Sequence, residues 1–209
     1  MSVSVVLLAK VPAPGRVKTR LCPPCTPEQA ARVAAAALAD TVDAVDASGA
    51  GARVLLTDAA CPAPGGWAAR LQRGGPLDER LANGFADTGG TALLIGMDTP
   101  QLTGDHLDAA LRLLGDPDGP DAVLGPAEDG GWWALGLRDA RHGAALRGIP
   151  TSTGTTGSRT RAALRRRGLR VAELPRLRDV DTVQDAYAVA ALCPRGRRFP
   201  GVVAAEVPR

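Results

Sequence analysis

The stretch VSVVLLA, residues 3–9, and the loop KVPAPGRVKTR that follows it, residues 10–20, decide how the chain is expected to fold. A continuous apolar run rich in valine and leucine is typical of a strand buried on both faces of a parallel sheet. In open α/β sheets, ligands bind at the carboxyl ends of such strands. The loop is therefore the first place to look for a binding site.

This loop carries three cations within five residues, behind two prolines and a glycine. Backbone N–H groups and basic side chains together bind phosphate oxygens, and proline lowers the cost of ordering a loop. The G-x-x-x-x-G-K-[ST] spacing of a P-loop is absent, and a solvated basic turn is the alternative. We predict that a nucleotide is bound here by Ala9, Lys10, Pro14, Gly15, Arg16, Lys18 and Arg20.

The composition is that of an ordinary globular protein. The 209 residues are 45% hydrophobic and 22% charged, and a net charge of +3 is too small to indicate nucleic-acid binding by itself. Since no signal peptide is recognised and no stretch approaches the roughly 18 apolar residues of a membrane span, we expect a cytoplasmic protein. We expect one domain over residues 1–193 and a loose tail over 194–209, with a homodimer as an open alternative to a monomer.

Apolar runs alternate with helical patterns along most of the chain. This alternation predicts an α/β fold, with one mostly parallel sheet flanked by helices. Thr26 followed by Pro27 marks the start of the first helix, because threonine caps helices and proline suits the first helical position. Further strands are expected at 53–57, 91–95, 121–124, 132–137 and 170–174, and helices at 26–47, 77–86, 104–114, 158–167 and 181–192.

Asp98 follows the strand expected at 91–95. A carboxylate at the end of a buried strand points toward the ligand crevice, and Mg²⁺ prefers carboxylate and phosphate oxygens. We predict that Asp98 is the principal ligand of Mg²⁺ or Mn²⁺, with a second carboxylate from Asp181 or Asp129. The alternatives are a turn or helix cap at Asp98 and an N-cap at Asp181.

A glycine pair, Gly130 and Gly131, follows two acids after the strand expected at 121–124. Glycine allows a close backbone approach to a ligand. We expect Glu128 and Asp129 to bind an acceptor hydroxyl, or Asp129 to act as a base, with a simple turn as the alternative.

Two loops complete the predicted site. PTSTGTTG, residues 150–157, is expected to form a mobile lid or an acceptor loop. The loop at 72–75 precedes a helix, and an amide there can read a nucleobase edge. The residues proposed from these loops are Ser152, Thr153 and Thr156 for the substrate, and Gln72, Gly74 and Gly75 for the nucleotide.

Five segments, taken together, resemble the nucleotide-diphospho-sugar transferase superfamily, and within it the small proteins described as cofactor-guanylyltransferase-like or as uncharacterised glycosyltransferases. The resemblance implies the A-type glycosyltransferase fold, with nucleotide phosphates on the first loop, the metal on Asp98 and the base near 72–75. Many members carry Asp-x-Asp where this chain has Asp98 alone. The segments are AKVPAPGRVKTRL (9–21), GGPLDERL (74–81), IGMDTPQLT (95–103), LGPAEDGGWWALGL (124–137) and LRDVDT (177–182).

Two transferase reactions are consistent with these residues. In nucleotidyl transfer, an NTP is attacked by a small anionic or phosphorylated acceptor, and cations including Lys18 neutralise the leaving pyrophosphate. In glycosyl transfer from an NDP-sugar, Asp129 activates the acceptor hydroxyl as a general base. We favour the first reaction, because three cations suit a triphosphate better than a diphosphate. A nucleotide-binding regulatory module is disfavoured, because it needs no acidic metal site opposite a basic loop.

Overall fold

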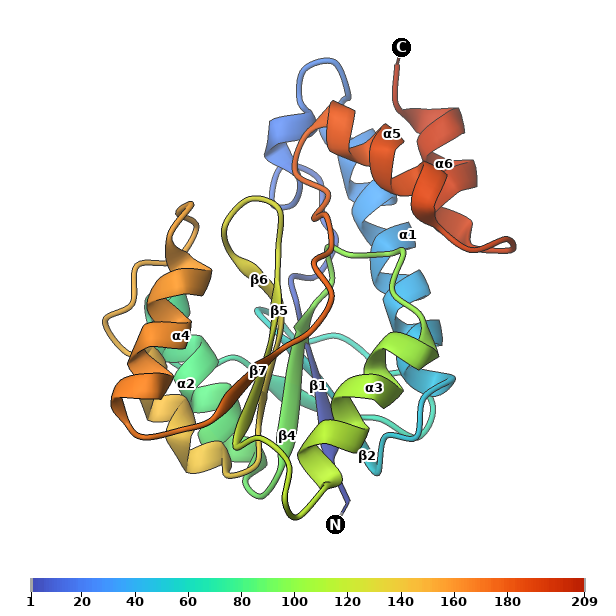
Figure 1. The fold of residues 1–209 in the computed structure, drawn as a ribbon. Helices are drawn as coiled ribbons and strands as arrows, with labels where there is room; N and C mark the ends of the chain where they lie inside the picture. The colour runs from blue at the N-terminus through green and yellow to red at the C-terminus, as the bar shows by residue number, and fades with distance from the viewer. Residues whose placement is uncertain (1, 209) are drawn as a thin grey trace.

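The computed structural model describes residues 2–208, which form a seven-stranded sheet with helices on both faces (Figure 1). Within these residues β6 is the one strand that runs antiparallel to its neighbours, and the remaining pairs are parallel. The predicted α/β class with a mostly parallel sheet is confirmed. In the order in which they pair, the strands are β3 (Ala68–Leu71), β2 (Ala52–Thr57), β1 (Ser4–Ala9), β4 (Ala92–Gly96), β6 (Trp132–Leu137), β5 (Ala122–Pro126) and β7 (Val171–Glu173).

The helices cover the two faces of the sheet in separate groups (Figure 1). One face is covered by α1 (Pro27–Asp46) and α3 (Gly104–Gly115), and the other by α2 (Leu77–Thr88), η2 (Ala140–Leu146) and α4 (Thr156–Arg166). Thr26 begins α1 with a capping box to Gln29, as its sequence predicts. Thr103 begins α3 in the same way, through His106.

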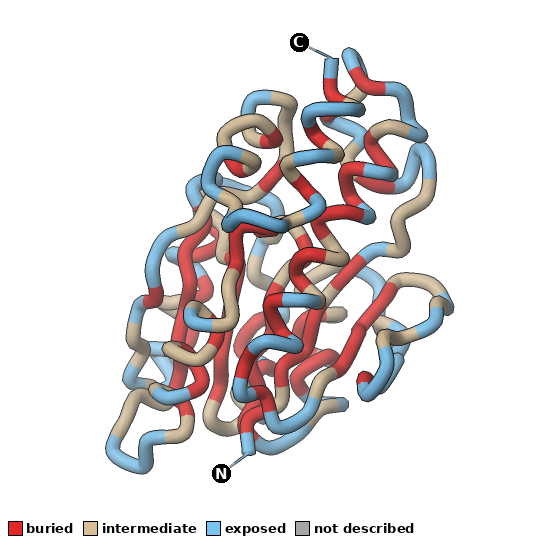
Figure 2. Tube along the Cα trace, turned by 90° about the vertical axis from the view of Figure 1, so that its right-hand side faces the viewer, coloured by how far each residue is buried: buried red, intermediate tan, exposed pale blue. Residues whose placement is uncertain are grey.

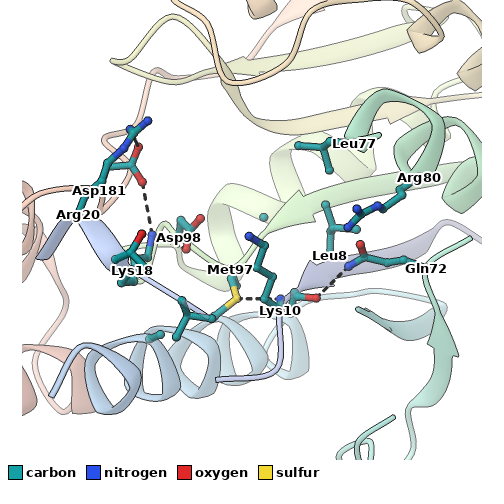
Figure 3. Close-up of a pocket in the computed structure, with 15 residues that line it drawn as sticks. Leu8, Lys10, Lys18, Arg20, Gln72, Leu77, Arg80, Met97, Asp98 and Asp181 are labelled. Atoms are coloured by element: carbon teal, nitrogen blue, oxygen red, sulfur yellow. Dashed lines mark hydrogen bonds and ion pairs between the residues drawn. The ribbon is translucent and has the colours of Figure 1, made fainter. Parts of the chain in front are cut away.

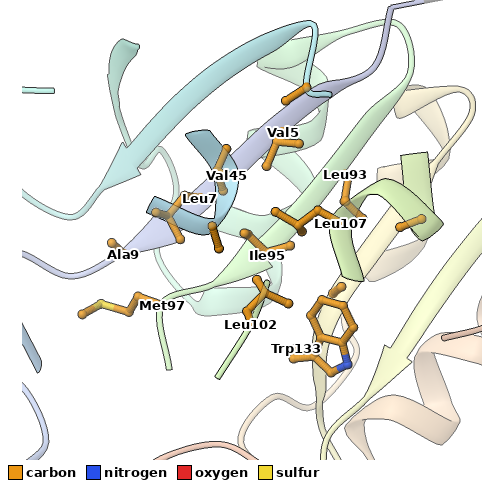
Figure 4. Packing of buried hydrophobic residues seen from close by; sticks show 14 of the residues in the cluster. Val5, Leu7, Ala9, Val45, Leu93, Ile95, Met97, Leu102, Leu107 and Trp133 are labelled. Atoms are coloured by element: carbon orange, nitrogen blue, oxygen red, sulfur yellow. The ribbon is translucent and has the colours of Figure 1, made fainter. Parts of the chain in front are cut away.

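β1 is buried on both faces, which explains its unbroken apolar sequence. Val5 and Leu7 pack under α1 and α3 (Figure 4), whereas Val6 packs under α2 with Leu94. Figure 2 shows that buried residues gather in the middle of the molecule, while exposed residues lie on the outer turns and loops. The sheet is thus a rigid support for the loops that follow its carboxyl ends.

The end of the chain differs from the expected loose tail. Beyond α5 (Val183–Leu192), the chain forms α6 (Arg198–Glu206), which packs on α1 (Figure 1). Phe199 is fully buried, and both carboxylate oxygens of buried Asp40 accept backbone N–H groups at the start of α6. These contacts come from α1, over 150 residues earlier in the chain, so the local composition could not reveal them.

The sequence also did not predict the short helices η1 (Thr19–Leu21) and η2, or β3, a short edge strand whose four residues are all exposed. In the described part of the chain, no helix combines the length and the apolar character that crossing a bilayer requires.

Candidate active site

A cavity of about 320 Å³ opens where β1 and β4 end. Acidic and basic side chains lie at one end of it, and an amide lies with apolar side chains and Arg80 at the other (Figure 3). The predicted residues that line it are Ala9, Lys10, Lys18, Arg20, Gln72, Asp98 and Asp181. The structure therefore brings together residues of the first loop, the loop at 72–75, the end of β4 and the segment before α5.

Lys18 lies at the centre of the charged end. Its ammonium is 2.6 Å from Asp98 Oδ1 and 3.6 Å from Asp181 Oδ1, and it also donates to the Val180 carbonyl. The Lys18 side chain is 7% exposed, whereas Asp98 is 43% exposed. The backbone of Lys18 is left-handed, with φ 48° and ψ 38°, a conformation that costs a non-glycine residue roughly 1–2 kcal/mol. Such strain is found most often at functional sites.

Asp181 is free to act in this cluster because it does not cap a helix. The N-cap of α5 is Thr182, whose capping box is completed by Asp185. Asp181 instead pairs with Lys18 and with Arg20, whose Nη1 is 3.3 Å from Asp181 Oδ2. Arg20 belongs to η1 (Thr19–Leu21), the short helix that ends the basic loop. The alternative of an N-cap at Asp181 is therefore wrong.

Asp179 is a third acid of this cluster and was not among the predicted ligands. Its burial, followed by the negative charges of Asp98 and Asp129, raises the pKa of Asp179 to about 8. The sequence signal that could have identified Asp179 is the D-V-D spacing at 179–181, because alternate residues of an extended chain face the same side. We call Asp98, Asp179 and Asp181 the carboxylate cluster.

The carboxylate cluster has the right chemistry for a divalent metal ion. Carboxylate oxygens are the donors that Mg²⁺ and Mn²⁺ prefer. Burial contributes most to the raised pKa of Asp179, and a cation would relieve the smaller contribution from the neighbouring carboxylates. Within residues 2–208, however, no three acidic, histidine or cysteine side chains are already gathered tightly enough to hold an ion. In the structure, the Lys18 ammonium contacts two of the three acids.

Arg16 does not face the cavity, although it belongs to the predicted phosphate-binding set. Its guanidinium lies 3.2 Å from Asp58 Oδ2, and the other oxygen of Asp58 accepts the Val11 N–H at 2.8 Å. Pro14 and Gly15 form an exposed turn beside it and also lie outside the cavity lining. Asp58, which the sequence did not single out, thus anchors both ends of this turn.

Gln72 occupies the other end of the cavity (Figure 3). Its Nε2 donates to the carbonyls of Ala9 at 2.9 Å and Leu56 at 3.2 Å, so the amide orientation is fixed and Oε1 remains as an acceptor. Leu8 and Leu77 provide apolar walls nearby. Gly74 and Gly75 shape the turn before α2, where the Gly75 N–H donates to Glu79, and they do not line the cavity.

The β5–β6 turn lies beyond the carboxylate cluster. Asp129 Oδ1 accepts the Gly131 N–H at 2.7 Å, while Glu128 Oε2 lies 3.6 Å from the Arg178 guanidinium. Neither acid lines the cavity, but Asp129 is near enough to Asp179 to raise its pKa. Asp179 likewise lies outside the cavity lining, but Asp129 accepts a backbone N–H group of its own turn, so we treat Asp129 as a neighbour of the carboxylate cluster.

The two predicted acceptor segments, the β5–β6 turn and the loop at 150–157, pack against each other. The Gly157 N–H donates to the Gly130 carbonyl at 2.9 Å, and a Cβ on Gly130 would clash with the Gly154 backbone. The glycine pair was predicted to let a ligand approach the backbone closely, but in the structure the backbone of the loop at 150–157 takes that place.

Within the loop at 150–157, the hydroxyl of buried Thr156 donates to the Pro150 carbonyl at 2.9 Å. The Thr156 hydroxyl, which was predicted to contact the substrate, therefore stabilises the loop instead. Ser152 and Thr153 remain exposed, and Ser152 has a left-handed backbone with φ 57°.

Comparisons with known proteins agree with this fold. The family described as "Uncharacterized protein conserved in bacteria (DUF2064)" matches residues 29–153. No curated protein matches the chain. A "putative nucleotide-diphospho-sugar transferase" from Desulfovibrio desulfuricans G20 has a similar structure, with 25% identity, a TM-score of 0.81, and coverage of 98% of this chain and 94% of the other.

Two more distant structures share the fold alone. CMP:2-keto-3-deoxy-manno-octonic acid synthetase, solved with CTP, is 13% identical with a TM-score of 0.58, covering 92% of this chain and 98% of the other. Rv0371c from Mycobacterium tuberculosis H37Rv, solved with manganese, is 20% identical with a TM-score of 0.53, covering 90% and 97%. The predicted resemblance to the nucleotide-diphospho-sugar transferase superfamily is confirmed.

Proposed function

The chain belongs to the bacterial family whose description matches residues 29–153, and we propose that it is a metal-dependent transferase that uses a nucleotide-activated donor. The reaction we favour is nucleotidyl transfer from an NTP to a small anionic or phosphorylated metabolite. The observation that carries this proposal is the lining of the cavity: carboxylates with the Lys18 and Arg20 cations lie at one end, and a fixed amide, two apolar side chains and the Arg80 guanidinium lie at the other (Figure 3).

The charged end suits the polyphosphate and its metal ion. We assign Mg²⁺ or Mn²⁺ to Asp98 and Asp181, with Asp179 as a third ligand. When bound, the ion would supply Lewis-acid stabilisation of charge on the phosphates. Lys10 reaches into the cavity (Figure 3), and together with Arg20 it supplies positive charge for the phosphate oxygens.

The other end suits the nucleobase. Two backbone carbonyls hold Gln72 Nε2, which fixes the position of Oε1 on the other side of the amide. Oε1 can therefore accept an N–H group of the base without the entropic cost of ordering the side chain. Leu8 and Leu77 offer apolar surface for the ring or the ribose. Because nucleotides of this kind are cytoplasmic metabolites, we propose a cytoplasmic location.

The acceptor is a small molecule rather than a nucleic acid, and we place it between the carboxylate cluster and the β5–β6 turn. Exposed Glu128, Ser152 and Thr153 can contact it. Glycosyl transfer from an NDP-sugar is the second candidate, favoured by the described activity of the Desulfovibrio neighbour. In that reaction Asp129 would act as the general base.

A thermal-shift panel of NTPs and NDP-sugars with Mg²⁺ tests the proposal. A ligand present at about 100 times its Kd stabilises by about 2.7 kcal/mol, which for a protein of this size corresponds to roughly 5–10 °C in Tm. The stabilising ligand is then incubated with candidate acceptors. Release of pyrophosphate identifies nucleotidyl transfer, and release of a nucleoside diphosphate identifies glycosyl transfer.

Asp98→Asn should keep the fold but lower turnover by at least about 100-fold, as expected when an electrostatic contact is lost. The matched control is Asp118→Asn, an exposed acid whose loss should leave turnover unchanged. No stabilisation by any nucleotide, or full turnover in the presence of EDTA, would contradict the proposal.

A further inference from the structure

We propose that Lys18 is an exchangeable counter-ion of the carboxylate cluster. In the metal-free protein its ammonium holds Asp98 and Asp181, and a divalent cation displaces it from them into the cavity. The released ammonium then binds a phosphate of the nucleotide, a last step that rests on the proposed function. Lys18 thereby couples the binding of metal and nucleotide.

The contacts of Lys18 are those of a cation in an oxygen site. Its Nζ meets one carboxylate oxygen of Asp98 at 2.6 Å, one of Asp181 at 3.6 Å, and the Val180 carbonyl. These are the hard oxygen donors that Mg²⁺ or Mn²⁺ would use. An ammonium and a divalent cation repel each other, which disfavours contact of both with the same oxygens.

The exposures of the three side chains show where the ammonium would go. Asp98 and Asp181 line the cavity and their side chains are 43% and 37% exposed, whereas the Lys18 side chain is 7% exposed. The lysine stem is long and flexible, so its end can move by rotation about side-chain bonds while the backbone stays fixed. Lys18 is itself one of the residues that line the cavity, so the path into it is short.

The left-handed backbone of Lys18 supports a role that depends on this residue's position. A lysine that only bound phosphate could reach the cavity from a relaxed backbone, as Lys10 does. Lys18 instead begins η1 in a strained conformation that directs its side chain to the Val180 carbonyl and the two acids. The strained backbone conformation of Lys18 therefore lies at the point where the basic loop meets the carboxylate cluster.

The sequence provides a clean test, because Lys10 and Lys18 are its only lysines. The wild-type protein is treated with a trace of acetic anhydride at fixed pH, and the extent of acetylation at each lysine is measured by mass spectrometry. A short lysine-containing peptide added to every reaction is the standard, and exposed Lys10 is a second standard only in the arms without nucleotide, because Lys10 is itself proposed to contact the phosphates. Labelling is done without metal, with Mn²⁺ up to saturation, and with Mn²⁺ plus the nucleotide that stabilises the protein.

We expect Lys18 to be protected from acetylation without metal, to react about tenfold faster at saturating Mn²⁺, and to be protected again when nucleotide is added. A tenfold change lies within the range usual for coupled sites. Free Mn²⁺, followed by electron paramagnetic resonance, reports saturation. By reciprocity, Lys18→Met should bind Mn²⁺ about five- to tenfold more tightly than the wild type. Arg166→Met, which removes an exposed positive charge outside the cavity, is the control and should retain wild-type Mn²⁺ affinity.

Equal protection of Lys18 with and without saturating Mn²⁺ overturns the exchange, because Lys18 would then be a permanent partner of the acids. This outcome leaves nucleotide binding intact. Failure of the proposed function appears separately, as the absence of any stabilising nucleotide in the thermal-shift panel, while Mn²⁺ still releases Lys18.

Discussion

Asp58 ties the basic loop to the end of β2, and its removal should loosen the loop. The Val11 N–H donates to Asp58 Oδ1 at 2.8 Å, and the Asp58 side chain is 14% exposed. A hydrogen bond to a charged group of this kind contributes about 1.5–3 kcal/mol. The ion pair with Arg16, which is 61% exposed, contributes less than about 1 kcal/mol. Asp58→Ala should therefore lower the free energy of unfolding by about 2–3 kcal/mol.

Asp58→Asn separates the two contributions. Asparagine keeps a side-chain oxygen for the Val11 N–H but loses the charge that holds Arg16, so its cost should stay below about 1 kcal/mol. If the loop must be ordered to bind nucleotide, Asp58→Ala weakens binding by as much as about 25- to 140-fold, since each 1.4 kcal/mol of the 2–3 kcal/mol is a factor of ten. Asp58→Asn should bind within about threefold of the wild type or more tightly, because Arg16 is freed.

Urea unfolding measures the stability of the two variants, and isothermal titration calorimetry with the stabilising nucleotide and Mg²⁺ measures their affinity. The reasoning is refuted if the alanine and asparagine variants bind nucleotide equally well, or if the asparagine variant is as unstable as the alanine variant. Either result would mean that the Val11 hydrogen bond does not hold the loop.

Two further predictions concern the framework of the site. Asp40→Ala leaves two backbone N–H groups of α6 unpaired, so the free energy of unfolding in urea should fall by about 2–5 kcal/mol, while nucleotide affinity stays unchanged. Unchanged stability would contradict the anchoring of α6. Gly130→Ala should lower stability by about 1–3 kcal/mol more than Gly148→Ala, because only the former adds a clash, with the Gly154 backbone, to the strain of a positive φ. Equal Tm values for the two variants would argue against the contact.

The sequence by itself determined the layers of this protein and the location of its cavity. Hydrophobic runs and helix caps act over a few residues, so β1, β4 and the start of α1 could be placed from local pattern alone. Since a parallel sheet collects its carboxyl ends at one edge, the loops carrying Lys18, Gln72 and Asp98 were expected to meet there. They do line one cavity.

Only the tertiary structure decided which charges face one another. Lys18 meets Asp98 and the Val180 carbonyl across 80 and 162 positions of sequence, and Arg16 is drawn away from the cavity by Asp58. The packing of α6 against the rest of the protein likewise depends on contacts with α1. Local pattern cannot fix such pairings, because an ion pair or a buried hydrogen bond depends on where the sheet and its loops bring distant residues, and not on the residues beside them.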